Sequence, residues 1–348
     1  MISVILAGGK GQRLWPESRL AHPKQFCKFL DDKSLLENTI DCLMNAGSNK
    51  VIIITNDSLL ETTQALITSR SDSQMIEILS EPEGKNTAPA IGLALAKCGM
   101  VEENSIIGIF PADHYITDIA GFTHSIQTAA KTAIQGFIVT IGITPSRPET
   151  GYGYIEKDSL QINDLSNVYK VCSFLEKPDF TTAQEYIKSD RYLWNSGIYI
   201  AQVKTLRGEF ARYLPDIHKQ ILKGYIHYIR SYSDLPNISL DYGISEKTKI
   251  MAVVESNFDW SDLGSWEVLK TLFENDSAEN CLIGKDILAL ESKSCIVKQA
   301  DKTVVLYGVD NLLVVETGEI VLVTSREKSQ DIPSLLEILQ QKGRQDLL

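Results

Sequence analysis

The residues with the clearest chemical potential follow directly after the first apolar run of the sequence, ISVIL at 2–6. Gly8, Gly9 and Gly11 carry no side chains, so a ligand can approach their backbone N–H groups closely. Arg13 adds a guanidinium, which can bind two phosphate oxygens at once. This combination at the end of a strand is typical of a loop that binds phosphate groups.

Two familiar phosphate-binding loops are excluded by the residues around the glycines. A Walker A loop requires Ser or Thr after its Gly-Lys pair, but Gly11 follows Lys10. A dinucleotide-binding loop requires a third glycine at the position where Leu14 stands. For the loop taken alone, a glycine turn with incidental charges remains the alternative.

The pattern around this loop predicts a doubly wound, Rossmann-like α/β fold with a mixed, mainly parallel sheet. Continuously apolar runs, typical of buried parallel strands, lie at 2–6, 50–55, 75–79, 105–110 and 137–143. Amphipathic segments predict helices over 34–47, 87–99 and 122–134. The first of these helices begins with a capping box, with Ser34 at the N-cap and Glu37 three residues later.

The chain is expected to contain two domains. Residues 1–275 form the catalytic domain, in which an irregular stretch over 146–275 supplies the loops that bind ligands at strand ends. Residues 276–348 contain short β runs at near-regular spacing, which predict a small β module. A solenoid, such as a left-handed β-helix, and a sandwich both suit these runs. We expect the module to serve domain packing or oligomerisation, with a homodimer as the assembly.

Composition and charge exclude several classes of function. The net charge of −11 argues against a nucleic-acid partner, because phosphate backbones bind basic surfaces. The six cysteines contain no CxxC pair, which argues against a zinc site or a disulfide framework and is typical of a reducing compartment. No signal peptide and no apolar run of about 20 residues is evident. We therefore expect a cytoplasmic protein that does not bind membranes.

The glycine loop and the residues after it resemble a family signature. LAGGKGQRLWP (6–16) followed by SRLAHPKQF (18–26) is similar to the sugar-nucleotide pyrophosphorylases, and most of all to bacterial mannose-1-phosphate guanylyltransferases. Later motifs follow in the family's order, so the resemblance covers residues 1 to about 275. These motifs are EPEGKNTAPAIGLAL (81–95), FPADHYI (110–116), PETGYGYI (148–155), FLEKPD (174–179), WNSGIYI (194–200), DYGISEKT (241–248) and FDWSDLGSW (258–266).

The resemblance implies transfer of GMP from GTP to α-D-mannose 1-phosphate, giving GDP-mannose and pyrophosphate by Mg²⁺-assisted in-line attack. A phosphate monoester has a second pKa of about 6, so this nucleophile is already ionised and needs no general base. The chemistry instead needs positive charge around the triphosphate, for which Arg13 and Lys24 are the expected catalytic residues. Long members of the family append a cupin isomerase domain, for which this chain ends too early, so we expect the short form with transferase activity only.

The resemblance pairs Asp113 with Asp262 as ligands of Mg²⁺, with phosphate oxygens and water completing the coordination. An isolated aspartate in a turn is more often a cap, so the pairing depends on the family match. We expect His114 to pack behind Asp113 rather than to bind the metal.

Binding of the nucleotide is expected to involve the three loop glycines, Arg13 and Asp113 together with the segment that begins at Glu81. Guanine presents N1–H and N2–H₂ side by side, and a carboxylate such as that of Glu81 can accept both hydrogen bonds. Asn86 and Thr87 stand nearby at the start of a predicted helix. Asn86 could instead cap that helix, or fill both roles.

For the sugar phosphate, the resemblance points to Gly151, Glu176, Lys177 and Asn195. Glu176 would accept hydrogen bonds from two hydroxyls, Lys177 would bind the phosphate and Asn195 would contact a further hydroxyl. Gly151 would leave room for the sugar ring. The neighbouring aromatic residues are expected to pack rather than to stack on ligands: Tyr152, Tyr154, Trp194 and Trp260.

Three alternatives stay open. A pyrophosphorylase of the same fold could use another base or sugar, although uridylyl and thymidylyl relatives carry a glutamine-led motif where Glu81 stands. A non-catalytic regulatory homologue is expected to lack the loop arginine, the lysine or a metal aspartate, all of which this chain retains. A glycosyltransferase would show a DxD metal motif, but Asp113 has no aspartate two residues away.

Overall fold

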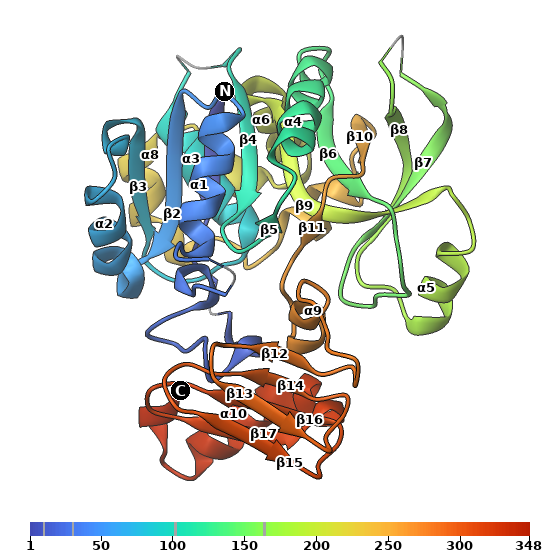
Figure 1. Ribbon diagram of the computed structural model, residues 1–348. Helices are drawn as coiled ribbons and strands as arrows, with labels where there is room; N and C mark the ends of the chain where they lie inside the picture. Colours follow the sequence, from blue (N-terminus) through green and yellow to red (C-terminus); the bar gives the residue numbers. More distant parts are fainter. Residues whose placement is uncertain (10, 30, 101–102, 163–164) are drawn as a thin grey trace. The chain divides into compact units, whose positions relative to one another are not determined.

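The computed structural model describes residues 1–9, 11–29, 31–100, 103–162 and 165–348 (Figure 1). The chain divides into two compact units, each assembled from three segments. The sheet unit comprises Met1–Gly8, Asn38–Ala112 and Ile116–Trp260, and the solenoid unit comprises Gly9–Glu37, Asp113–Tyr115 and Ser261–Leu348. Two of the points at which the chain passes between the units lie in the short strands β5 (Tyr115–Ile116) and β11 (Trp260–Ser261).

A nine-stranded sheet with the order β3-β2-β1-β4-β9-β6-β10-β8-β7 forms the centre of the sheet unit. Seven strands run in one direction, and β8 and β9 run opposite to them. The strands are β1 (Ile2–Leu6), β2 (Lys50–Asn56), β3 (Ile76–Glu81), β4 (Ile106–Pro111), β6 (Ile138–Ile143), β7 (Tyr154–Gln161), β8 (Val168–Leu175), β9 (Tyr192–Gln202) and β10 (Met251–Ser256). The mixed, mainly parallel sheet is confirmed, and the five predicted strands correspond to β1, β2, β3, β4 and β6.

Helices cover both faces of the central strands of this sheet, which explains why β1, β2, β4 and β6 are apolar along most of their length, whereas β7 and β8 at one end of the strand order carry exposed polar residues (Figure 1). The predicted helices are α1 (Leu35–Asn45), α3 (Thr87–Cys98) and α4 (Ile119–Ala133). The sequence analysis did not predict α2 (Leu60–Thr68), α5 (Phe180–Tyr186), α6 (Val203–Tyr213), α7 (Pro215–Ile221) and α8 (Tyr225–Arg230).

The helix starts follow local capping chemistry. Glu37 Oε2 accepts a hydrogen bond from the Ser34 N–H at 2.8 Å, and Ser34 Oγ accepts one from the Glu37 N–H at 3.3 Å, which confirms the predicted capping box. Helix α4 begins three residues before its predicted start, because Asp118 caps it by accepting from the N–H of Gly121 at 2.8 Å.

In the solenoid unit, successive strands alternate between two sheets. One sheet contains β12 (Cys281–Ile283), β14 (Ile296–Lys298), β16 (Leu312–Glu316) and β17 (Val321–Ser325), and the other contains β13 (Ile287–Leu290) and β15 (Val304–Tyr307). All pairs except β16–β17 are parallel. Alternation with parallel pairing is the arrangement of a solenoid, so the sandwich alternative is excluded. The helices α9 (Trp266–Lys270) and α10 (Ile332–Gln341) complete this unit.

The segment after the glycine loop belongs to the core of the solenoid unit. Leu14 and Trp15 are buried together with Trp266 and Leu313. The Trp15 indole N–H donates to the carbonyl oxygen of Leu347 at 2.7 Å. These contacts fix the residues that follow the loop, because a buried tryptophan cannot move without breaking its packing. Within the described ranges, no helix is long and apolar enough to cross a membrane.

Candidate active site

Lys24 stands at the centre of a charged cluster in the solenoid unit. It begins the 3-10 turn η2 (Lys24–Phe26), and its side chain is only 7% exposed. The ammonium donates to Asp113 Oδ2 at 2.8 Å and to the main-chain oxygen of Asp262. Residues 24, 113 and 262, which are far apart in the sequence, are therefore brought together. The family motifs predicted the pairing of Asp113 with Asp262, but not the place of Lys24 between them.

The glycine loop is shaped by close contact with this lysine. Gly11 has a φ of +50°, and a Cβ atom there would lie 2.6 Å from the Cβ of Lys24. Only glycine fits such a conformation and such an approach. The Gln25 amide holds the loop by donating to the carbonyl oxygen of Gly9 at 3.2 Å.

The loop presents donors that the protein does not use. In the part of the chain that is described, the backbone N–H groups of Gly8, Gly9 and Gly11 make no hydrogen bond within the protein. Arg13 lies in the 3-10 turn η1 (Gln12–Leu14), is exposed, and has no ion pair among the same residues. Unpaired backbone donors and a free guanidinium suit an anionic ligand. Lys10 lies outside the described residues.

Asp113 and Asp262 supply the negative charge of the cluster. Although burial opposes ionisation, the neighbouring Lys24 ammonium keeps the pKa of Asp113 below its usual value. Burial lowers the pKa of His114 to about 4, so this imidazole is neutral at physiological pH and adds no positive charge. Asp262 is oriented by its own turn, because its Oδ1 accepts from the N–H of Gly264 at 3.1 Å.

The cluster fits a divalent cation that shares its coordination with a ligand. Among the described residues, no group of three or more His, Cys, Asp or Glu side chains is arranged to hold a metal ion. Mg²⁺ is commonly bound by one or two carboxylates plus phosphate oxygens and water, so two aspartates are sufficient. The Lys24 ammonium is bound by the Asp113 carboxylate and by the main-chain oxygen of Asp262, so oxygen atoms of both residues are available to a positive charge.

Glu81 lies at the end of β3 in the sheet unit and is only 6% exposed. Its Oε2 accepts a hydrogen bond from the Tyr232 hydroxyl at 2.5 Å. A Cβ atom on Gly8 would collide with its Oε1, so the glycine permits the carboxylate to approach the backbone. Burial raises the pKa of Glu81, and the Tyr232 hydroxyl acts in the opposite direction.

Asn86 and Thr87 form the start of α3. Asn86 has a φ of +68°, and its Oδ1 accepts from the N–H of Thr87 at 3.0 Å, so the predicted capping role is present. Thr87 Oγ1 accepts from the N–H of Leu240 at 2.8 Å. The start of α3 is thereby fixed to the segment before Asp241.

The predicted sugar residues have three different surroundings within the sheet unit. Glu176 and Lys177 form an ion pair at 3.2 Å, and Lys177 has a φ of +50°. Gly151 lies beside Glu149, whose Oε1 accepts its N–H at 3.0 Å. The glycine that faces Glu176 is Gly153, where a Cβ atom would lie 2.6 Å from Glu176 Oε2. Gly153 was not among the predicted residues, although it belongs to the same PETGYGYI motif.

Asn195 is buried in a polar network rather than exposed to a ligand. Its Oδ1 accepts from the Thr140 hydroxyl at 2.8 Å, and its Nδ2 donates to Tyr199 Oη at 2.9 Å and to Asp241 Oδ1 at 3.2 Å. The Tyr199 hydroxyl also donates to Asp241 Oδ1 at 2.6 Å. Burial raises the pKa of Glu176 most, and the negative charge of the nearby Asp241 carboxylate raises it further.

Asp241 and Tyr199, which share this network with Asn195, were not among the predicted site residues. Asp241 is the first residue of a π-helical turn, Asp241–Ser245, a feature often found at functional sites. Both residues belong to motifs that carried the family resemblance, DYGISEKT and WNSGIYI. That membership was the available signal, because nothing in the local spacing relates position 241 to position 195.

The aromatic residues of this region pack on one another as predicted. Tyr152 makes edge-to-face contacts with Trp194 and Trp260, at centroid distances of 5.2 and 5.5 Å. Tyr154 contacts Tyr186 at 5.4 Å. Each of the four rings therefore packs against another aromatic side chain.

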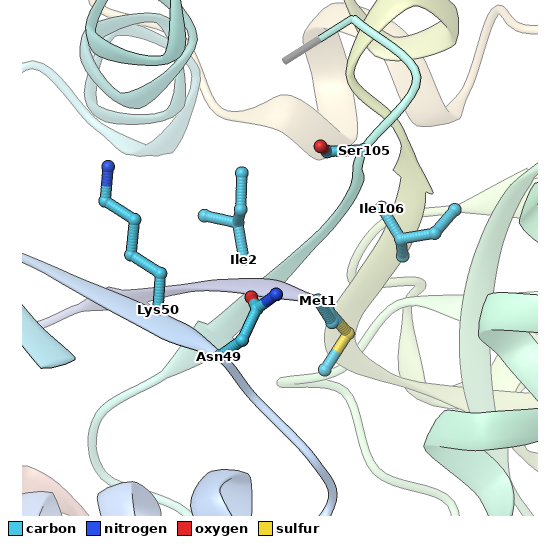
Figure 2. A pocket seen from close by; sticks show the side chains of 6 residues that line it. All are labelled: Met1, Ile2, Asn49, Lys50, Ser105 and Ile106. Atoms are coloured by element: carbon cyan, nitrogen blue, oxygen red, sulfur yellow. The ribbon is translucent and has the colours of Figure 1, made fainter.

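A hollow of about 430 Å³ lies at the amino ends of the parallel strands, the end opposite to the one at which the glycine loop begins (Figure 2). It is lined by residues at the amino ends of β1, β2 and β4: Met1, Ile2, Asn49, Lys50, Ser105 and Ile106. Open α/β sheets bind their ligands at the carboxyl ends of the strands, and none of the predicted site residues lines this hollow. We therefore do not assign it to the active site.

The sequence is similar to known families and proteins over nearly its whole length. Residues 2–279 match the nucleotidyl transferase family, and residues 285–339 match the mannoseP isomerase/GMP-like beta-helix domain. A mannose-1-phosphate guanylyltransferase from Escherichia coli is 35% identical and aligns with 99% of this chain and 77% of its own. One from Klebsiella pneumoniae is also 35% identical, with 99% of this chain and 75% of its own aligned.

A solved structure supports the same relationship. The crystal structure described as mannose-1-phosphate geranyltransferase from Thermus thermophilus superposes with a TM-score of 0.87 at 32% identity, covering 97% of this chain and 99% of that one. The beta-helix match agrees with the solenoid that the strands of the C-terminal part form. By the family match and by these relatives, the chain belongs to the nucleotidyl transferase family, among the mannose-1-phosphate guanylyltransferases.

Proposed function

We propose that this protein transfers GMP from GTP to α-D-mannose 1-phosphate, releasing pyrophosphate and forming GDP-mannose. The observation that carries the proposal is the cluster of Lys24, Asp113 and Asp262 after a glycine loop whose N–H groups are unpaired among the described residues. The relatives named mannose-1-phosphate guanylyltransferase support this choice of substrates.

The chain's own groups would lower the barrier mainly by neutralising charge. The sugar phosphate is ionised at neutral pH, so no side chain needs to remove a proton from it. Lys24, Arg13 and the N–H groups of the loop would bind the phosphate oxygens as negative charge shifts towards the leaving pyrophosphate. Asp113 and Asp262 would hold Mg²⁺, which supplies further positive charge to these oxygens when it is bound.

Selection of the base would depend on Glu81. A carboxylate can accept N1–H and N2–H₂ of guanine together, and uracil and thymine lack that pair of donors. The Tyr232 hydroxyl occupies one lone pair of Oε2 and leaves further acceptor positions on both oxygens. Asn86 and Thr87, at the start of α3, are the other proposed nucleotide contacts.

Selection of the sugar would depend on Glu176, Lys177, Asn195 and Gly151. The Lys177 side chain is 55% exposed and ends 3.2 Å from Glu176, so it can reach a phosphate while Glu176 accepts sugar hydroxyls. Because both amide donors of Asn195 have protein partners, its contribution would be the orientation of the network around Asp241.

We assign residues 1–275 to the catalytic domain and residues 276–348 to a module for packing and oligomerisation. Leu288 and Leu290 on β13 lie opposite Val305 and Tyr307 on β15, and all four are at least 51% exposed. Such a row of exposed apolar side chains suits a homodimer interface. The free cysteines support a reducing compartment, and we place the activity in the cytoplasm.

Pyrophosphate release with Mg²⁺ tests this function. GTP, UTP, dTTP, ATP and CTP are each combined with mannose, glucose and N-acetylglucosamine 1-phosphate. We expect release with GTP and mannose 1-phosphate to exceed all other combinations. A preference for another pair would refute the assigned substrates, and no release with any pair would favour the regulatory homologue.

A further inference from the structure

One of the two carboxylates assigned to the metal ion is already paired with a positive charge. Lys24 Nζ lies 2.8 Å from Asp113 Oδ2 and donates to the main-chain oxygen of Asp262. The side chain is 7% exposed, so the ammonium is held within the cluster rather than in solvent. Among the described residues, Lys24 is the cation that pairs with Asp113.

The backbone of Lys24 is fixed, so only its side chain can move the charge. The η2 turn is closed by the Cys27 N–H, which donates to the Lys24 carbonyl oxygen at 3.0 Å. Gly11 packs directly on the Lys24 Cβ. Gln25 ties the same turn to the glycine loop through Gly9. Rotation about the side-chain bonds remains possible, and it would carry the ammonium from Asp113 to a phosphate bound at the loop.

An ammonium and a divalent cation compete for the same carboxylate. The Lys24 side chain is buried and the Asp113 side chain is 37% exposed, so water screens the repulsion between two positive charges at this carboxylate only in part. A triphosphate changes this balance, because its oxygens offer the ammonium other acceptors and add negative charge for the metal.

We propose that Lys24 occupies the cation position in the free protein and excludes the metal until the triphosphate draws its ammonium away from Asp113. Metal and nucleotide then bind together, and the metal does not bind in advance. This inference rests on the proposed function and on its metal site at Asp113 and Asp262. Lys24 thus pairs with Asp113 before the nucleotide binds and with a phosphate afterwards.

Titration of the free protein with Mn²⁺, followed by the EPR signal of the unbound ion, tests the exclusion without turnover. Lys24→Met removes the charge and keeps most of the stem, and Lys24→Gln does the same with a polar end. We expect either variant to bind Mn²⁺ at least tenfold more tightly than the wild type in the absence of nucleotide. Asp113→Asn in the Lys24→Met background should remove the gain.

Lys28 provides the matched control, because it is an exposed lysine four residues away with no ion pair among the described residues. Lys28→Met should leave Mn²⁺ binding unchanged. With a GTP analogue that cannot be cleaved between the α- and β-phosphates, the wild type should gain at least tenfold in Mn²⁺ affinity. Folded Lys24→Met and Lys24→Gln variants that bind Mn²⁺ no better than the wild type would overturn the inference.

The test separates this inference from the proposed function. Pyrophosphate release by the wild type depends on the substrates and is measured independently. A gain in Mn²⁺ affinity in the Lys24 variants, together with a wild type that releases no pyrophosphate, would support the exclusion and refute the transferase. Pyrophosphate release by the wild type without a gain in Mn²⁺ affinity in the Lys24 variants would support the transferase and refute the exclusion.

Discussion

Tyr232→Phe tests how the buried carboxylate of Glu81 is held. The substitution removes the hydroxyl that donates to Glu81 Oε2 at 2.5 Å and leaves the ring in place. Tyr232 is fully buried and Glu81 is 6% exposed, so water cannot readily replace the lost donor. The variant should therefore retain the fold but lose stability.

The magnitude follows from the charge on the acceptor. A hydrogen bond to an ionised group contributes about 1.5–3 kcal/mol, so we expect a loss of about 2 kcal/mol in the free energy of unfolding at pH 8. When Glu81 is protonated, the hydrogen bond is neutral, so the loss in the free energy of unfolding should fall to about 1 kcal/mol. The effect of the substitution therefore depends on the ionisation of Glu81.

The direction of the pH dependence follows from the pKa of Glu81. Burial already raises this pKa above the unfolded value, and loss of the Tyr232 hydroxyl would raise it further. Between the unfolded and folded pKa values, the folded variant binds more protons than the unfolded chain. The contribution of Glu81 to the stability of the variant is therefore fully present below the unfolded pKa and is lost as the pH rises through the folded pKa.

Urea unfolding at pH 5, 6.5 and 8 measures this effect, with Tyr228→Phe as the matched control. The Tyr228 hydroxyl donates to the neutral carbonyl oxygen of Pro89 at 2.8 Å, so its loss should cost about 1 kcal/mol at every pH. A Tyr232→Phe deficit that grows as the pH falls from 8 to 5, or that is no larger at pH 8 than the deficit of Tyr228→Phe, would refute this account of Glu81.

Three further predictions concern the loop, the solenoid and the sugar site. Gly11→Ala should lower the rate of pyrophosphate release at least 100-fold, because the added Cβ would collide with Lys24. Gly208→Ala, which has open space around it, should leave the rate unchanged. Equal rates in the two variants would contradict this prediction. Glu316→Gln should lower the free energy of unfolding in urea by about 1–3 kcal/mol, because three backbone N–H groups and a lysine outweigh burial and lower the pKa of Glu316 to about 2. The stability that Glu316 contributes to the wild type is lost as the pH falls from about 4.5 towards 2. A difference between variant and wild type that does not change with pH would argue against this prediction. Asp241→Asn should raise the KM for mannose 1-phosphate at least tenfold and leave the KM for GTP unchanged, and steady-state kinetics with an unaltered sugar KM would remove Asp241 from the site.

Much of the sheet was predictable, because its parallel strands are buried on both faces and read as continuous apolar runs. The capping box of Ser34 and Glu37 was equally visible, since both partners lie within one turn. The solenoid was not decided by sequence, because parallel pairing between β12 and β14 joins residues in different coils and leaves no local signature.

The candidate site was predictable where chemistry is local and unpredictable where it depends on the fold. The loop glycines and Arg13 stand together in the sequence, so their phosphate chemistry could be inferred. Tyr232 lies 151 residues from Glu81, and only the packing behind α3 brings the two together. The same holds for the hydrogen bond between Asn195 and Asp241.

The central claim is transfer of the α-phosphate of GTP to mannose 1-phosphate, and isotopic labelling tests it directly. GTP labelled in the α-phosphate and GTP labelled in the γ-phosphate are incubated separately with the protein, Mg²⁺ and mannose 1-phosphate. We predict that the α label is recovered in GDP-mannose and the γ label in pyrophosphate. Recovery of the γ label in a sugar product, or no transfer of the α label, would contradict the account.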